Sequence, residues 1–336
     1  MKESTRSAYV FPGQGSQWVG MGSNLYKSSP VAKKVFDEAD EVLGFPLSRL
    51  CFEGPEDELK RTVNAQPAVL TLSLAYLKTA LAEGRMNGEA LPEMVAGHSL
   101  GEYTALVAGG VIDFSQAVQL VRERGRLMNK AGNKRKGGMA AVIGLNREAL
   151  QEVCEQSGAY VANINSAEQI VISGNKKSLE KATELAKSAG ARRAIPLPVS
   201  GAFHCEMMEP ALKGMTEFIN EMEFQEPKMP LIANTTATPL TTSAEIKAEL
   251  INQLCNCVDW QGCIKYMADA GINTFVEIGP GQVLTGLIRR ITPEAETVNI
   301  GEPQPGVYVL SWRPPAPKTK RATIKARQRA WGYLIG

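Results

Sequence analysis

The chain has 336 residues, of which 44% are hydrophobic, 21% charged and 6% aromatic. This composition is typical of a globular protein with one large core or two smaller ones, and it excludes a disordered chain, a collagen-like repeat and a small disulfide scaffold. The 37 basic and 35 acidic residues nearly cancel, so the net charge of +2 gives no reason to expect a nucleic-acid partner.

The first part of the chain alternates between short apolar runs and helical patterns. This alternation is typical of an α/β fold with a largely parallel sheet. Strands are expected at residues 8–11 and 94–97, and helices at 30–43, 66–81 and 102–108. A similar pattern returns near the C-terminal end, where residues 274–278 are expected to form a strand and a helix is expected to follow.

Residues 137–199 have the pattern of a separate unit. The expected elements are a strand, a helix, two strands, a helix and a strand, which is the β-α-β-β-α-β order of a ferredoxin-like subdomain. We therefore predict a small subdomain inserted into a larger α/β domain formed by residues 1–136 and 200–301. The basic, glycine-containing residues 130–138 are the predicted hinge between the two.

The C-terminal residues 302–336 differ from the rest of the chain. They contain seven basic residues and, after Glu302, no acidic one, together with a cluster of prolines. Nothing in this segment has the pattern of packed structure, so we expect a basic, disordered tail. The alternative is a tail that docks on an acidic partner.

Several cellular contexts are not supported by the sequence. No apolar stretch approaches the roughly 18 residues of a membrane span, and the polar N-terminus does not resemble a signal peptide, so a cytoplasmic location is expected. Cys255, Cys257 and Cys263 lie close together, but neither histidine is near them in sequence. Reduced thiols and no metal site are therefore expected.

The strongest chemical signal is the sequence Gly97-His98-Ser99-Leu100-Gly101 between a predicted strand and a predicted helix. This is the G-x-S-x-G pattern of a nucleophile elbow, in which a sharp turn exposes the serine hydroxyl at the start of a helix. Ser99 is therefore the predicted nucleophile. The backbone N–H of Leu100 would point to where a negatively charged oxygen develops in an acyl transfer.

A serine nucleophile needs a base, and the chain has only two histidines, His98 and His204. Adjacent side chains on such a turn diverge, so His204, where the inserted unit returns to the large domain, is the predicted base. The group that orients its imidazole is left open. Asp259 and Glu277 are the acids that stand out, and a backbone carbonyl could serve equally well.

Two further features bear on the site. Pro12-Gly13-Gln14-Gly15 follows the first strand, but Trp18 stands where a dinucleotide loop would need its third glycine. The backbone N–H of Gln14 is instead predicted as a second donor to the oxyanion. Arg124 lies on the apolar stripe of its helix, where it either forms an internal salt bridge or binds a substrate carboxylate.

Seven short motifs occur in one order and together resemble the malonyl-CoA:acyl carrier protein transacylases of bacterial fatty acid synthesis. They also resemble the acyltransferase domains of polyketide synthases. The motifs are Gly13-Gln14-Gly15-Ser16-Gln17, Gln66-Pro67-Ala68, Gly97-His98-Ser99-Leu100-Gly101-Glu102-Tyr103, Arg124-Gly125, Asn163-Ile164-Asn165-Ser166, Gly201-Ala202-Phe203-His204 and Gly279-Pro280-Gly281. The resemblance covers residues 8–303.

The resemblance implies an α/β-hydrolase-like domain with an inserted ferredoxin-like subdomain. It also implies a site in which Ser99 is the nucleophile, His204 the base and Arg124 the ligand of the malonyl carboxylate. The oxyanion would be bound by Gln14 and Leu100, and the histidine oriented by a main-chain carbonyl that matches Gln253. The other residues that it places in the substrate pocket are Gln66, His98, Asn165 and Phe203.

The residue directly before His204 is Phe203. In having an aromatic residue at this position, the chain resembles the malonyl-selecting members of the family. The implied reaction is transfer of malonyl from malonyl-CoA to acyl carrier protein through a serine ester, with no cofactor. We expect a monomer, with no nucleic-acid or membrane partner. The alternatives are an acyltransferase of a polyketide pathway, a serine hydrolase and an inactive scaffold that retains the fold.

Overall fold

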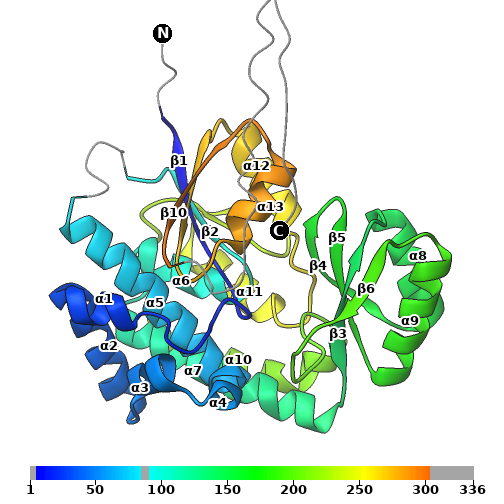
Figure 1. Cartoon of the computed structure of the whole chain (residues 1–336), viewed down its shortest axis with the longest axis horizontal. Coiled ribbons are helices and arrows are strands. Elements are labelled where there is room, and N and C mark those ends of the chain that lie inside the picture. The colour runs from blue at the N-terminus through cyan, green and yellow to red at the C-terminus, as the bar shows by residue number, and fades with distance from the viewer. Residues whose placement is uncertain (1–4, 85–90, 303–336) are drawn as a thin grey trace, which may run out of the picture.

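The structure is a computed structural model that describes residues 5–84 and 91–302. Apart from Glu302, the predicted tail of residues 302–336 lies outside the described residues. The larger sheet has six strands in the order β10-β9-β1-β2-β7-β8 (Figure 1). Its neighbours run parallel except for β8, which is antiparallel to β7. The strands are β1 (Ser7–Phe11), β2 (Met94–Gly97), β7 (Leu231–Ile232), β8 (Pro239–Leu240), β9 (Thr274–Ile278) and β10 (Glu296–Ile300).

Helices cover both faces of this sheet, and the alternation of side chains along β1 shows why. Tyr9 and Phe11 point into one core, whereas Ala8 and Val10 point into a second core on the opposite face. Strands buried on both faces have continuous apolar sequences, as the first strand has. The helices of this unit are α1 (Ser23–Ser28), α2 (Pro30–Leu43), α3 (Leu47–Glu53), α4 (Glu56–Lys60), α5 (Thr62–Ala82), α6 (Leu100–Ala108), α7 (Phe114–Lys134), α10 (Glu209–Glu221), α11 (Ser243–Asn252), α12 (Trp260–Asp269) and α13 (Val283–Ile291), with a short 3₁₀ turn at Glu206–Met208.

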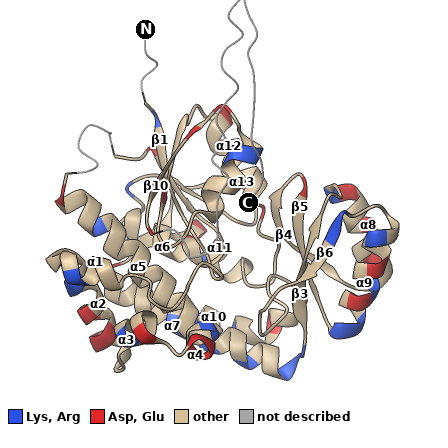
Figure 2. Cartoon of the chain, in the orientation of Figure 1, with Lys and Arg blue, Asp and Glu red and all other residues tan. Residues whose placement is uncertain are grey.

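The second sheet is separate and antiparallel, with the order β4-β5-β3-β6. Its strands are β3 (Gly138–Ile143), β4 (Tyr160–Ser166), β5 (Gln169–Gly174) and β6 (Arg193–Pro196), and its helices are α8 (Arg147–Ser157) and α9 (Lys176–Ser188). Both helices bury an apolar stripe against the sheet and carry charged side chains on their outer faces (Figure 2). The order of elements along the chain is the predicted one.

Several boundaries differ from the prediction. Helix α5 begins at Thr62 rather than at residue 66, and α6 begins at Leu100 rather than at residue 102. Helix α7 continues to Lys134, so that most of the expected hinge at residues 130–138 is helical. Strand β6 ends at Pro196 rather than at residue 199. The chain still follows β3 for one more residue, since the Leu197 N–H donates to the Met139 carbonyl at 2.9 Å.

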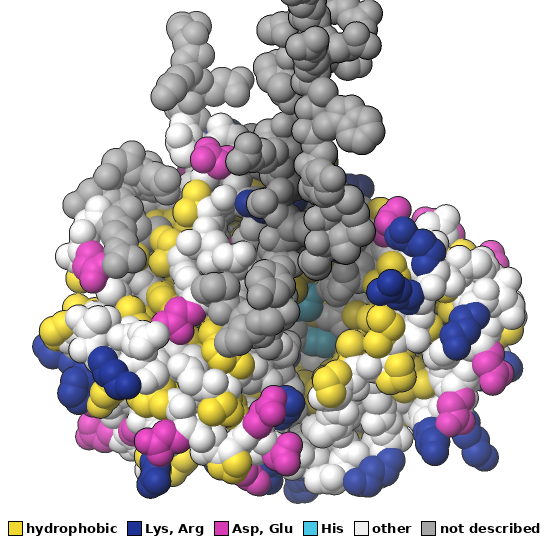
Figure 3. All heavy atoms as spheres, viewed as in Figure 1, with side chains coloured by type: hydrophobic (Ala, Val, Ile, Leu, Met, Phe, Trp, Pro, Cys, Tyr) yellow, Lys and Arg dark blue, Asp and Glu magenta, His cyan; other side chains and the backbone are white. Residues whose placement is uncertain are grey.

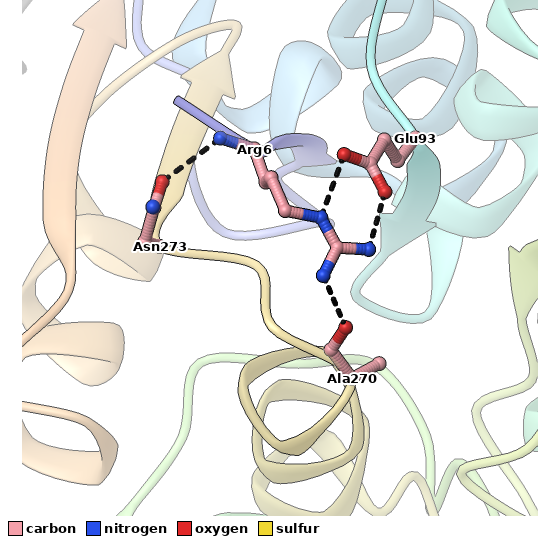
Figure 4. Close-up of polar contacts among 4 residues, drawn as sticks. All are labelled: Arg6, Glu93, Ala270 and Asn273. Carbon is pink, nitrogen blue, oxygen red and sulfur yellow. Dashed lines mark hydrogen bonds and ion pairs between the residues drawn. The ribbon is translucent and has the colours of Figure 1, made fainter. Parts of the chain in front are cut away.

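The two sheets are joined through residue 258, which follows α11. Val258 forms a parallel bridge with Asn163 of β4, and the Ile164 N–H donates to the Val258 carbonyl at 2.9 Å. At the amino ends of the parallel strands, Arg6 bonds both carboxylate oxygens of Glu93 and the carbonyl of Ala270 (Figure 4). This contact fixes the end of the large sheet that lies opposite to the carboxyl end of β2.

Two kinds of feature are absent from the described residues. Among residues 5–84 and 91–302, no helix has the length and apolar content needed to cross a bilayer. Within the same ranges, no group of three or more His, Cys, Asp or Glu side chains is placed to hold a metal ion. All six cysteines are free thiols.

Candidate active site

Ser99 lies at the carboxyl end of β2, directly before the first residue of α6. Its backbone has φ 52° and ψ −98°, a conformation that L-residues rarely adopt. The turn is possible because glycines flank it: a Cβ on Gly97 would lie 1.9 Å from the carbonyl carbon of Gly101, and a Cβ on Gly101 would lie 2.0 Å from the Phe11 oxygen. The G-x-S-x-G spacing is thus required by the close approach of β1, β2 and α6.

His204 reaches Ser99 from the segment that follows the small sheet. The serine Oγ and the histidine Nε2 are 2.7 Å apart, and the histidine Nδ1 lies 2.8 Å from the backbone oxygen of Gln253. The orienting group is therefore a main-chain carbonyl. Asp259 accepts from the Gly262 N–H at the start of α12, and Glu277 accepts from backbone N–H groups at the start of α13, so both acids are engaged elsewhere.

The His204 side chain is held in its neutral form. Its pKa is lowered from 6.5 to about 3, first because burial disfavours the charged imidazolium and second because the Arg124 guanidinium repels it. With Nδ1–H donating to the Gln253 carbonyl, the lone pair of Nε2 faces the serine hydroxyl. This is the tautomer that can accept the Ser99 proton.

Arg124 projects from α7 into the same site and is only 1% exposed. One terminal nitrogen donates to Gln66 Oε1 at 2.9 Å, and the other donates to Gln253 Oε1 at 2.7 Å and to Ser99 Oγ at 3.3 Å. No carboxylate of the described residues forms an ion pair with it, so the internal salt bridge left open by the sequence is wrong. The guanidinium is also stacked on Tyr103, 4.9 Å from the ring centre.

The site opens into a cavity of about 270 Å³ between the two sheets. Ser99, His204 and Arg124 lie at one end, and Phe203 is among the apolar side chains of the wall. Figure 3 shows histidine side chains in a hollow, with hydrophobic side chains along one side of it. The other apolar side chains that line the cavity are Pro12, Met128, Met139, Val171, Leu197, Val199, Val283, Leu284 and Leu287.

The remaining predicted residues are found in and around this cavity. His98 Nε2 lies 2.8 Å from Asn165 Oδ1, a contact that joins the elbow to the small sheet, and both residues line the cavity. Burial lowers the pKa of His98, so that this imidazole is also neutral. Gln66 is fully buried and lies behind Arg124 rather than on the cavity wall, which corrects its expected place in the pocket.

The two predicted oxyanion donors lie on the two sides of the nucleophile. Leu100 is the first residue of α6, and Gln14 lines the cavity on the loop after β1. The Gln14 side chain is held by Thr62 at 3.2 Å. Neither backbone N–H donates a hydrogen bond to another described residue, so both are available to a developing negative charge.

Two buried residues with contacts in the site were missed by sequence reasoning. The side chain of Asn234 accepts from the Ser99 N–H at 2.7 Å and donates to the Gly97 carbonyl at 2.8 Å, which fixes the elbow. The carboxylate of Glu102 contacts the Gln253 side chain at 2.5 Å. Glu102 lies inside the motif that begins at Gly97, but the sequence indicates no role for it. Asn234 follows a two-residue strand, and no local pattern marks it.

Comparison with known proteins identifies the family of the chain. The family model of the acyl transferase domain matches residues 8–305. The malonyl CoA-acyl carrier protein transacylase of Bacillus subtilis (strain 168) is 46% identical over 305 residues, which are 89% of this chain and 95% of the relative. That of Escherichia coli (strain K12) is 43% identical over 303 residues, covering 89% and 97% of the two chains.

Relatives from polyketide pathways are also similar. The polyketide biosynthesis malonyl CoA-acyl carrier protein transacylase of Bacillus subtilis (strain 168) is 43% identical over 295 residues, 86% of this chain and 98% of the relative. Among solved structures, an acyl carrier protein S-malonyltransferase from Vibrio cholerae superposes with a TM-score of 0.83 at 42% identity, covering 89% of this chain and 97% of that one. With these matches, the chain belongs to the malonyl CoA-acyl carrier protein transacylase family of acyl transferases.

Proposed function

We propose that this chain transfers a malonyl group from malonyl-CoA to the phosphopantetheine thiol of acyl carrier protein, through a malonyl ester on Ser99. The observation that carries the proposal is the position of Arg124. A buried guanidinium with no carboxylate partner among the described residues lies 3.3 Å from the nucleophile, on the wall of the cavity. A plain esterase has no use for such a cation, whereas an acyl group that ends in a carboxylate needs it.

In the first half-reaction, Ser99 Oγ attacks the thioester carbonyl of malonyl-CoA while its proton passes to His204 Nε2. The oxygen of the tetrahedral intermediate accepts hydrogen bonds from the backbone N–H groups of Gln14 and Leu100. When the carbon–sulfur bond breaks, His204 returns the proton to the departing sulfur. The products are free CoA and the malonyl ester of Ser99.

The second half-reaction is the reverse chemistry with a different thiol. The phosphopantetheine thiol gives its proton to His204 and attacks the ester, and the same backbone donors stabilise the second intermediate. Ser99 Oγ leaves with the proton and is regenerated. Nothing in this sequence of steps calls for a cofactor.

Arg124 selects and aligns the acyl group in this proposal. Its fork binds the malonyl carboxylate and thereby fixes the thioester carbonyl next to Ser99, which lowers the entropic cost of reaching the transition state. Phe203 lies on the cavity wall and would crowd a methyl branch at carbon 2. His98 and Asn165 line the same cavity, so we assign them to substrate binding, whereas Gln66 supports Arg124 from outside the cavity.

We also propose the domain division that the sequence predicts: an α/β-hydrolase-like domain at residues 1–136 and 200–301 with a ferredoxin-like subdomain at 137–199. The five parallel strands and the β2–α6 elbow support the first, and the antiparallel order β4-β5-β3-β6 with two helices on one face supports the second. A cytoplasmic location and a monomeric state stay predictions.

Fatty acid synthesis and a polyketide pathway differ in the acyl carrier protein that receives the malonyl group, whereas the chemistry of the transfer is the same in both. One solved relative is a malonyl-transacylase in complex with a type II polyketide acyl carrier protein, at 39% identity and a TM-score of 0.84. Because the first transacylase of Bacillus subtilis is 46% identical and the polyketide one 43% identical, we assign this chain to fatty acid synthesis and keep the polyketide carrier as the alternative.

The proposal is tested by the mass of the carrier. Holo acyl carrier protein is incubated with malonyl-CoA and catalytic amounts of the chain, and its intact mass is followed with time. We expect stoichiometric malonyl carrier that requires the phosphopantetheine arm. Release of free malonate without malonyl carrier would instead identify a hydrolase, and no turnover at all would identify an inactive scaffold.

A further inference from the structure

Glu102 is a fully buried carboxylate directly behind the nucleophile, in the first turn of α6. It accepts two hydrogen bonds, one from the Asn234 backbone N–H at 3.0 Å and one from the Gln253 side-chain nitrogen at 2.5 Å. It touches neither the cavity nor the base, so the reaction outlined above leaves it without a role. A buried carboxylate is costly unless it compensates another charge.

The side-chain amide of Gln253 connects this carboxylate to Arg124. Its nitrogen donates to Glu102 and to the Ser99 carbonyl at 2.8 Å, and its oxygen accepts from Arg124 at 2.7 Å. Both amide hydrogens and the amide oxygen are therefore used. Only one of the two amide orientations satisfies these partners, and Glu102, the Ser99 carbonyl and Arg124 select it together.

This arrangement solves an electrostatic problem of the site. Arg124 needs a counter-charge to remain buried, but a carboxylate in direct contact would occupy the nitrogen pair that a substrate carboxylate must reach. Placed one amide away, Glu102 leaves the outer edge of the guanidinium free. Burial and the neighbouring Glu249 raise the pKa of Glu102, and the hydrogen bonds from Asn234 and Gln253 and the charge of Arg124 oppose that rise. The nearest hydrogen-bond acceptors of Arg124 are the side-chain amide oxygens of Gln66 and Gln253.

We infer that Glu102 is a positioning residue for acyl-group selection: through the Gln253 amide it holds the Arg124 guanidinium in the orientation that binds a carboxylate-bearing acyl group. This inference rests on the proposed function, because it assumes that Arg124 binds the malonyl carboxylate. It predicts that a change at Glu102 alters the preference for malonyl over acetyl, although the residue cannot touch either substrate.

The isosteric variant Glu102→Gln breaks the arrangement without changing its volume. In this variant an NH₂ group replaces one of the two carboxylate oxygens of residue 102. It then faces either the Asn234 N–H or the Gln253 NH₂, and both of these groups are donors. If the Gln253 amide turned over to accept from the new NH₂ group, its own nitrogen would face the donor of Arg124. Every arrangement therefore leaves one donor against another in the buried site.

A matched control is available in Glu249 of α11. This carboxylate is also buried, at 4% exposure, and it accepts from the Thr235 backbone N–H at 2.8 Å and from the Thr235 hydroxyl at 2.5 Å. Because the Thr235 hydroxyl can accept as well as donate, Glu249→Gln keeps both contacts. Its side chain does not contact Gln253, and removal of its charge, which raises the pKa of Glu102, leaves the hydrogen bond between Glu102 and Gln253 in place.

The experiment measures kcat/KM for Ser99 acylation with malonyl-CoA and with acetyl-CoA in the full chain. For Glu102→Gln we expect the malonyl to acetyl ratio to fall by about tenfold to a hundredfold, as expected for one misplaced buried hydrogen-bonding group, mainly through a higher KM for malonyl-CoA. For Glu249→Gln we expect an unchanged ratio. A folded Glu102→Gln protein with the wild-type ratio, or an equal loss in both variants, would overturn the inference.

If Glu102→Gln does not fold, Gln253→Met carries the same test. Methionine keeps the length of the side chain and the backbone carbonyl that orients His204, but it removes the amide between Glu102 and Arg124. The expected result is again a lower malonyl to acetyl ratio, and an unchanged ratio contradicts the inference. A wild-type chain that forms no malonyl ester contradicts the proposed function itself, which distinguishes the two failures.

Discussion

The Nδ1 atom of His204 lies 2.8 Å from the backbone oxygen of Gln253, and the side chain of the same glutamine bonds Arg124 at 2.7 Å. One residue thus orients the base with its backbone and the carboxylate-binding group with its side chain. A neutral carbonyl fixes the imidazole tautomer and stabilises the imidazolium less than the charged aspartate of a serine-protease triad does. The base therefore gives its proton up readily, as a reversible transfer between two thiols requires.

The state of the base can be observed directly, because His98 and His204 are the only histidines of the chain. Burial and the Arg124 charge lower the pKa of His204 to about 3, and burial lowers that of His98. In an untagged protein, neither imidazole NMR signal should titrate near pH 6.5. His204 should stay neutral until strongly acidic pH, because protonation is resisted in the folded state.

The same titration identifies the second cause of the shift. In Arg124→Gln the repulsive charge is absent, so the pKa of His204 should rise, while burial still keeps it below 6.5. A His204 signal that titrates near 6.5 in the wild type, or one that does not move in the variant, would contradict this account of the base.

The carboxylate-binding role of Arg124 predicts a change of substrate preference. Arg124→Gln should lower kcat/KM for malonyl-CoA by about a hundredfold or more, since charge-assisted hydrogen bonds to the substrate are lost. Acylation by acetyl-CoA, which has no carboxylate, should change far less. Arg126, which is exposed and paired with Glu123, gives the control variant Arg126→Gln. Equal loss with both substrates would mean that the arginine serves the fold.

Phe203 predicts the tolerance for a branched acyl group. Its ring is 6% exposed and lines the cavity beside His204. Phe203→Ser should raise kcat/KM for methylmalonyl-CoA relative to malonyl-CoA by about tenfold or more, because one methyl group in a fitted pocket is worth about 1–3 kcal/mol. The measurement is a competition between the two thioesters, read as the ratio of the two enzyme adducts. An unchanged ratio of the two adducts would show that Phe203 does not determine the selection between these acyl groups.

The elbow predicts a sharp difference between two glycines. A Cβ at Gly101 would lie 2.0 Å from the Phe11 oxygen, whereas a Cβ at Gly286 of α13 meets nothing within 4 Å. Gly101→Ala should therefore lower the free energy of unfolding by about 3 kcal/mol or more and abolish acylation. Gly286→Ala should raise it by up to about 1 kcal/mol, because alanine favours a helix. Thermal or urea unfolding of both variants gives the comparison.

The sequence was informative wherever function imposes a local pattern. The glycines around Ser99 mark a turn that other residues cannot make, and the helical spacing around Arg124 placed a charge on an apolar stripe. The strands on both sides of the small subdomain follow from alternation and turn residues alone. In each case the physical cause acts between residues that are close in sequence.

The rest of the site depends on contacts between distant segments. Asn234 and Ser99 are 135 positions apart, and nothing near Asn234 indicates that its amide closes the elbow. Gln66 was expected on the pocket wall, but whether a side chain reaches the cavity or supports Arg124 from behind is decided by how α5 and α7 pack. Glu102 shows the same limit, since its partner Gln253 lies 151 positions away.

The most direct test of the account is the intact mass of the chain after brief incubation with malonyl-CoA. The account predicts an increase of one malonyl group, absent in Ser99→Ala and discharged when holo acyl carrier protein is added. Acetyl-CoA should give little adduct under the same conditions. An adduct that persists in Ser99→Ala, or free CoA and malonate without any adduct that the carrier can discharge, would contradict it.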